Sequence, residues 1–213
     1  MKLNITSGES GHEVISNNID CLKWAAMRAA DSELPPTEGV CIILTKSGSR
    51  LNSIRREDGI GTMGVNLNLK QEELDKFVKL YSSFNSSNAK IYGLDKALWH
   101  FGRSCLSTIE RDILLESAIG IDSIVSNDSR DSAYRFQLHG SALLSFIDPK
   151  IKETVYKELS NIYKRRSSAA HGTGSMKKSG ENLHEKARTY LAKMMESVLV
   201  LNDNNNLNWS VSP

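Results

Sequence analysis

The sequence predicts a mainly α-helical protein, with a helical bundle in the C-terminal half and a small mixed α/β region before it. Three observations support this prediction. Apolar residues recur at helical spacing through residues 90–201. No strand-like alternation interrupts that stretch. Two short strand-like runs instead fall within the first 88 residues.

Two helices are predicted in the N-terminal region. Residues 19–30 place apolar side chains at helical spacing, and the prolines at 35 and 36 cannot continue that helix. Residues 71–84 carry apolar side chains on one face, which is typical of an amphipathic helix. The Ser/Asn-rich segment 82–88 predicts a linker.

Two short strands are predicted between these helices. Residues 40–44 form an apolar run bounded by Gly39 and Gly48, as a buried strand would. Residues 65–69 alternate apolar and polar side chains, which indicates a half-exposed strand. The sequence leaves open whether the two strands pair.

The chain after residue 90 is a succession of amphipathic segments. The expected helices cover residues 92–106, 108–125, 133–146, 151–162 and 183–201. Asp148 supplies an N-cap for the fourth of them, and Pro149 suits its first turn.

Three regions follow from this pattern. Residues 1–88 form the mixed α/β region of unknown role, for which we hypothesise a regulatory or sensing function. Residues 89–205 form the helical domain. The Asn-rich end predicts a frayed tail over residues 206–213.

The composition narrows the classes of function. A net charge of +2 and a pI near 8.4 predict no broadly basic surface, so any RNA contact is expected at a few cations. The N-terminus lacks the apolar core of a signal peptide, and no apolar run is long enough to span a membrane. We therefore expect a cytoplasmic protein with no membrane partner. The three cysteines are far apart and predict reduced thiols.

Two further patterns are rejected as functional sites. Gly59, Gly61 and Gly64 match GxGxxG, but the strand before and the helix after that phosphate binding requires are missing. The five histidines show no metal-ligand spacing, so neither a metal nor another cofactor is expected. His100 and His139 lie in amphipathic helices, where we expect hydrogen-bonded structural roles.

Candidate catalytic residues are predicted in one segment, residues 163–175. Arg166 comes just after an apolar helix face, His171 follows it by five positions, and small residues fill the gap. Gly172 and Gly174 then break the helix. On a helix, the two side chains start about 140° apart around the axis. A long arginine stem can still bring its guanidinium toward a histidine at the helix end.

Such a pair suits phosphodiester cleavage without a metal. Arg166 offers a planar, permanently charged group to the phosphate oxygens. His171 can move the proton of a ribose 2′-hydroxyl or of the leaving 5′-oxygen. The alternative is a basic helix end that complements the helix dipole and precedes a glycine cap. The spacing alone favours that alternative, because Arg and His are common near helix ends.

The motif is similar to one in a known family. Tyr163, Arg166, His171 and Gly172 form a Tyr-x-x-Arg-x4-His-Gly string, which resembles the motif of the Apea-like HEPN domains. The resemblance covers residues 90–201 and implies a helical HEPN fold.

Two upstream positions bear on this resemblance. Family members usually have an acidic residue near the position of Asp122 in the second helix. The chain departs from the family at His139, where a basic residue is common.

The resemblance implies a metal-independent endoribonuclease. Arg166 would stabilise the transition state, and His171 would act as general acid and base. The products would be a 2′,3′-cyclic phosphate and a 5′-hydroxyl. Such domains often serve as toxins or antiviral effectors that cut tRNA, mRNA or rRNA. Family members typically face two motifs across one cleft, which implies a homodimer through the HEPN domain.

Further residues are candidates for contacts with RNA. Tyr163, Lys164, Arg165 and Ser167 are expected to bind substrate, and Lys177 and Lys178 could contact the phosphate backbone. A regulatory protein partner is a further expectation. Two other functions stay open: a non-catalytic HEPN module for dimerisation or RNA binding, and an antitoxin-like or scaffold protein with no role on RNA.

Overall fold

The fold is mainly α-helical, as predicted. In a computed structural model of the chain, the residues described are 11–32, 40–45, 48–53, 70–85, 93–125, 132–171 and 182–203. Within these ranges the α-helices are α1 (Gly11–Ala29), α2 (Gln71–Phe84), α3 (Leu94–Leu106), α4 (Glu110–Val125), α5 (Ser132–Ile147), α6 (Lys152–His171) and α7 (Leu183–Asp203). The 3-10 turn η2 (Pro149–Ile151) precedes α6.

The helices expected after residue 90 are all present. The fourth is longer than predicted, because α6 continues past the apolar run to His171. In η2, just before α6, the backbone N–H of Lys150 donates to Asp148 Oδ1 at 3.2 Å, so Asp148 satisfies a backbone donor where an N-cap was expected. In the N-terminal region α2 has the predicted bounds, whereas α1 begins at Gly11 rather than near residue 19.

A hairpin lies between α1 and α2. Strand β1 (Val40–Thr45) covers the predicted apolar run and pairs antiparallel with β2 (Gly48–Ser53), so that Val40 lies opposite Ser53. The run at 65–69, also predicted as a strand, lies outside the described residues. An N-terminal region with a mixed α/β fold of its own stays a prediction.

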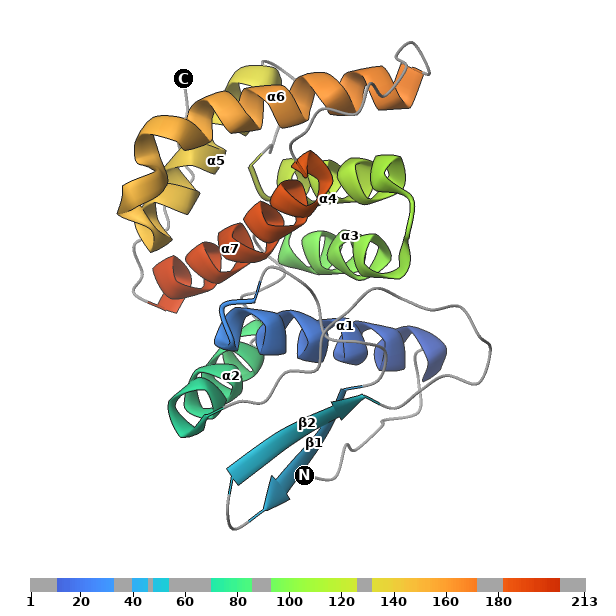
Figure 1. The fold of residues 1–213 in the computed structure, drawn as a ribbon, viewed down its shortest axis with the longest axis vertical. Coiled ribbons are helices and arrows are strands. Elements are labelled where there is room, and N and C mark those ends of the chain that lie inside the picture. Colours follow the sequence, from blue (N-terminus) through green and yellow to red (C-terminus); the bar gives the residue numbers. More distant parts are fainter. Residues whose placement is uncertain are drawn as a thin grey trace.

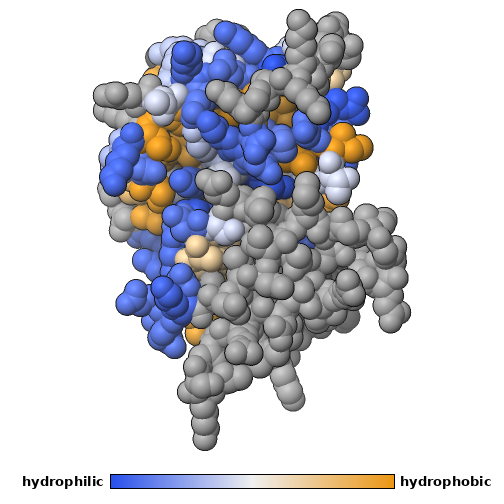
Figure 2. Space-filling view, in the orientation of Figure 1, coloured by the Kyte–Doolittle hydropathy of each residue, from blue (hydrophilic) through white to orange (hydrophobic). Residues whose placement is uncertain are grey.

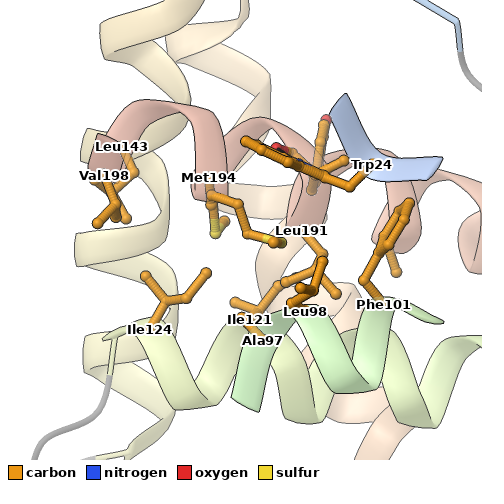
Figure 3. Close-up of a cluster of buried hydrophobic side chains, with 14 of the residues drawn as sticks. Trp24, Ala97, Leu98, Phe101, Ile121, Ile124, Leu143, Leu191, Met194 and Val198 are labelled. Carbon is orange, nitrogen blue, oxygen red and sulfur yellow. Dashed lines mark hydrogen bonds between the residues drawn. The ribbon is translucent and has the colours of Figure 1, made fainter. Parts of the chain in front are cut away.

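Helix α7 is the central element of the bundle. It contacts every other α-helix that the structure describes. In Figure 1, α5 and α6 lie above it, α3 and α4 beside it, and α1 and α2 below it. Figure 3 shows Leu191, Met194 and Val198 of α7 between apolar side chains of the neighbouring helices. All three are buried.

Helix α1 belongs to the same hydrophobic core. Trp24 is fully buried, and its indole Nε1–H donates to the carbonyl oxygen of Ala192 in α7 at 3.0 Å. One turn further along α1, Arg28 Nε donates to Glu196 Oε2 of α7 at 2.7 Å. Lys76 of α2 lies 3.1 Å from the other carboxylate oxygen of Glu196. The helices before residue 88 therefore share one core with those after it.

Asp20 of α1 lies directly against α3. A Cβ atom on Gly102 would stand only 2.2 Å from Asp20 Oδ2, so the absence of a side chain at Gly102 makes room for the carboxyl. Burial raises the pKa of Asp20 to about 6, against the opposing effect of Lys23. This carboxyl therefore stays protonated up to a higher pH than an ordinary aspartate does.

The shared core predicts the effect of Trp24→Ala. The substitution should destabilise the chain by about 3–5 kcal/mol, because it removes a fully buried indole and leaves a cavity. Urea unfolding followed by circular dichroism should still show one transition, shifted as a whole. Val78→Ala on the exposed face of α2 is the control and should change stability by less than about 0.5 kcal/mol. Separate unfolding of α1, with the main transition unchanged, would contradict the shared core.

The buried carboxyl of Asp20 predicts that the free energy of unfolding depends on pH. Because the pKa of Asp20 is higher in the folded chain than its ordinary value of 3.8, its stabilising contribution is full below that value and is lost as the pH rises through about 6. Asp20→Asn should therefore be more stable than wild type near pH 7, with a smaller difference near pH 4. Denaturant unfolding of both proteins at the two pH values measures this difference in stability. A variant less stable than wild type at neutral pH would show that the charged carboxyl is favourable.

Candidate functional site

Arg166 lies at the end of the buried face of α6. Val155, Leu159 and Ile162 line that face at helical spacing and are fully buried. Arg166 follows Ile162 by four residues and so lies on the same side, one turn further on. Its side chain is therefore directed toward the helices on which α6 packs and remains 24% exposed.

An acidic residue of α4 binds this arginine. Arg166 Nη2 donates to Asp122 Oδ2 at 3.0 Å, and the Asp122 side chain is 23% exposed. Asp122 is at the position where the HEPN resemblance led us to expect an acidic side chain. A half-buried, charge-assisted hydrogen bond of this kind fixes the guanidinium more firmly than a fully exposed ion pair would.

The ring of Tyr163 also lies beside the arginine. The Arg166 guanidinium lies 5.6 Å from the centre of the Tyr163 ring. The Tyr163 hydroxyl is 2.8 Å from Ser132 Oγ at the start of α5. The Tyr163 ring also meets the buried ring of Phe136 edge-on, with centroids 5.3 Å apart. Tyr163, predicted to bind substrate, thus also links α6 to α5 and supports Arg166.

The other predicted substrate contacts lie on the last turns of α6. Lys164 and Ser167 are exposed, and Arg165 is half-buried. Ser168 Oγ donates to the carbonyl of Lys164 at 3.2 Å. In the view of Figure 2, hydrophilic side chains cover much of the coloured upper part of the molecule, where α6 lies in Figure 1.

His171 is the last residue of α6. Its backbone is helical, so it starts about 140° around the axis from Arg166, as expected for a five-residue separation. Its side chain, Gly172 and the lysines at 177 and 178 lie outside what the structure describes. The structure therefore brings together Arg166, Tyr163 and Asp122, and the approach of His171 stays a prediction.

Two contacts of this site were not predicted. Ser132 and Phe136 reach Tyr163 because α5 packs on α6, and no spacing along the chain indicates that pairing. The string of motif residues pointed to α6 alone.

The two histidines that were predicted to have structural roles make hydrogen bonds within the chain. His100 Nδ1 lies 2.8 Å from Glu116 Oε2, and His139 Nδ1 lies 3.1 Å from the carbonyl oxygen of Val125, which confirms hydrogen-bonded roles for both. Cys21 and Cys105 are free, buried thiols. The glycine pattern at 59–64 lies outside the described residues.

Across the described ranges, no three His, Cys, Asp or Glu side chains come together as metal ligands would. Within the same ranges, no helix has the length and apolar character needed to cross a membrane.

The geometry predicts coupling between Asp122 and Arg166. A double-mutant cycle with Asp122→Ala and Arg166→Ala should give a coupling energy of about 1 kcal/mol, the upper end for such pairs, because both side chains are about three-quarters buried. Arg111 and Asp112 form a more exposed pair at 3.2 Å and provide the control cycle, expected near zero. Chemical denaturation of the four proteins in each cycle measures both values. Equal coupling in the two cycles would mean that burial adds nothing to the Arg166 contact.

Comparison with known proteins adds no relative to this picture: no family model, curated protein or solved structure matches the chain. The HEPN resemblance therefore rests on the motif string and its surroundings.

Proposed function

We propose that the chain is a metal-independent endoribonuclease of HEPN type. The observation that supports this most is the placement of Arg166. It is held by Asp122 and Tyr163 at the end of α6, five residues before His171, and stays partly exposed to solvent.

The contacts of Arg166 suit it to bind a phosphate. A guanidinium carries five N–H donors, and the contact with Asp122 uses one of its nitrogens, Nη2. Donors on the remaining nitrogens can then meet phosphate oxygens. A group already fixed in place needs little reorganisation as negative charge develops in the transition state, so its interaction strengthens at the right moment. Asp122 and Tyr163 would act as positioning residues.

His171 would move the protons. The neutral imidazole of His171 would take the proton of the ribose 2′-hydroxyl. The protonated imidazole would supply a proton to the leaving 5′-oxygen. The 2′-oxygen would form its bond to phosphorus as the bond from phosphorus to the 5′-oxygen breaks. The products would be a 2′,3′-cyclic phosphate and a 5′-hydroxyl, formed without a metal ion.

The same proposal extends to the RNA substrate and to the assembly of the protein. Lys164 and Arg165 adjoin Arg166 on α6 and can contact neighbouring phosphates of tRNA, mRNA or rRNA. A homodimer through the HEPN domain would bring two copies of the motif to one cleft. Cleavage of cellular RNA fits a toxin-type stress response or antiviral defence, with a regulatory protein to restrain it.

A second function is favoured by one observation. Both contacts described for the Arg166 guanidinium are made within its own chain, to Asp122 and Tyr163. These contacts would serve equally in a non-catalytic HEPN module for dimerisation or RNA binding, where Arg166 stabilises the packing of α4 on α6.

Cleavage assays distinguish the two functions. Wild type, Arg166→Ala, His171→Ala and the exposed control Arg111→Ala are incubated with total tRNA and mRNA in a metal chelator, and the ends are mapped. Wild type and the control should cleave and leave cyclic phosphates. Each motif variant should lose at least about a hundredfold in rate, since it lacks a charge stabiliser or a proton carrier. Thermal melts establish that the variants are folded.

Two results would count against catalysis by Arg166 and His171. Equal cleavage by all four proteins would reject the assignment to Arg166 and His171. If wild type binds RNA without cleaving it, and the motif variants bind equal amounts, the results would favour the non-catalytic module. Gel filtration of the same samples tests the dimer independently of activity.

A further inference from the structure

An exposed tryptophan lies on the outer face of α3. Trp99 is 45% exposed, whereas Trp24 is fully buried in the core and donates its indole N–H to a backbone carbonyl. Exposed side chains recur along α3 at positions 96, 99, 103 and 106, so Trp99 belongs to one stripe that faces solvent. Helix α4 covers another side of α3 (Figure 1). A large part of the indole is therefore left in water, where a ligand can cover it.

Two neighbouring side chains flank the Trp99 ring. The Arg103 guanidinium lies 4.7 Å from the ring centre, and the His100 ring meets the indole edge-on, with centroids 4.8 Å apart. Glu116 of α4 anchors both neighbours. Arg103 Nε donates to Glu116 Oε1 at 2.8 Å, and His100 Nδ1 lies 2.8 Å from Glu116 Oε2. The Glu116 side chain is only 15% exposed, so the surface that Trp99 and Arg103 present is fixed before any ligand binds.

Arg103 keeps binding capacity after these contacts. Its side chain is 53% exposed. Its one hydrogen bond within the described residues uses Nε, so Nη1 and Nη2 retain their donors for a ligand. The pair thus presents a flat indole and a planar group of hydrogen-bond donors on one exposed surface.

The charges around this pair offset one another. Glu116 binds Arg103, and the exposed side chains of Asp95 and Lys96 on the first turn of α3 carry opposite charges. The cluster therefore has little excess positive charge, which is what attracts a phosphate backbone without regard to its bases. The flat surface is what remains for recognition, and nucleobases stack on indole and guanidinium groups alike.

We propose that Trp99 and Arg103 form a stacking site for one unpaired base of an RNA strand. Such a site rests on the proposed ribonuclease function and specifies single-stranded RNA as the substrate class, because bases within a duplex are already stacked on one another. Nη1 and Nη2 of Arg103 would donate to acceptors at the edge of the base. On α4, Glu116 precedes Asp122 by six residues, about 9 Å along the helix axis, which a few nucleotides can span. One strand can thus meet both Trp99 and Arg166.

A strand that cannot be cleaved tests the site without catalysis. Fluorescence anisotropy with a labelled, single-stranded 2′-O-methyl oligonucleotide measures the Kd, because the blocked 2′-oxygen prevents cleavage. Trp99→Ala and Arg103→Ala should each weaken binding at least about fivefold, since each removes a stacking partner. Trp99→Phe keeps an aromatic ring and should retain most of the affinity. Tyr156→Ala on α6 and Arg111→Ala on α4 remove an exposed aromatic and an exposed arginine, and these controls should bind as wild type does.

A second probe separates the bases from the backbone. A strand of the same length that lacks bases should bind wild type at least about fivefold more weakly than the full strand, and Trp99→Ala should lose this difference. An equal loss of affinity for both strands in Trp99→Ala would indicate contacts with phosphate or sugar and would overturn the site. A duplex that binds wild type as tightly as the single strand, or no binding of the single strand by wild type, would overturn it too.

Failure of this site can be told from failure of the proposed ribonuclease. If wild type cleaves RNA but Trp99→Ala binds the uncleavable strand as wild type does, the stacking site is wrong and the ribonuclease is not. If no protein cleaves RNA but Trp99→Ala shows the base-dependent loss, the stacking site holds without catalysis. Unchanged RNA affinity of Trp99→Ala with a lower mass in gel filtration would make Trp99 a contact between two copies of the chain and would overturn the proposal. Thermal melts establish that each variant is folded.

Discussion

Burial of α7 on nearly all of its sides is the constraint on which the other helices depend, since each of them covers part of its apolar surface. A polar side chain on an element buried in this way costs free energy unless a partner meets it. Ser197 donates to the carbonyl oxygen of Leu143 in α5, and Glu196 pairs with Arg28 and Lys76. The N-terminal helices therefore supply part of the charge balance of the C-terminal bundle as well as part of its core.

The candidate cleavage site depends on the same packing. Ile121 of α4 lies in the core shown in Figure 3, so the next residue, Asp122, is turned toward the side of α4 where α6 lies. On α6, Ile162 is anchored in the core, and Arg166 follows one turn later. The contact between Asp122 and Arg166 is thus fixed by two apolar stripes that hold α4 and α6 together. A charged pair placed by rigid neighbours keeps its geometry at little entropic cost.

The sequence predicts local features of this molecule well and long-range ones poorly. Helix α2 has the predicted bounds because its apolar residues recur regularly, whereas the first turns of α1 are largely polar and were not predicted as helix. The partner of β1 is β2, whose sequence GSRLNS contains a single large apolar residue and so gives no strand signal. Tyr163 and Arg166 were predicted as candidate site residues from a short motif. Ser132 could not be, because its contact depends on the packing of α5 on α6.

Three arginines show how burial and pairing together decide what such a residue does. Arg28 is buried and meets two carboxylates, so its charge is satisfied within the chain and its role is structural. Arg166 meets one carboxylate and remains partly exposed, so it is fixed in position and still reaches solvent. Arg188 is as buried as Arg28 but meets only a carbonyl oxygen among the described residues. A neutral acceptor does not balance a buried charge, so burial of Arg188 costs more free energy than burial of Arg28.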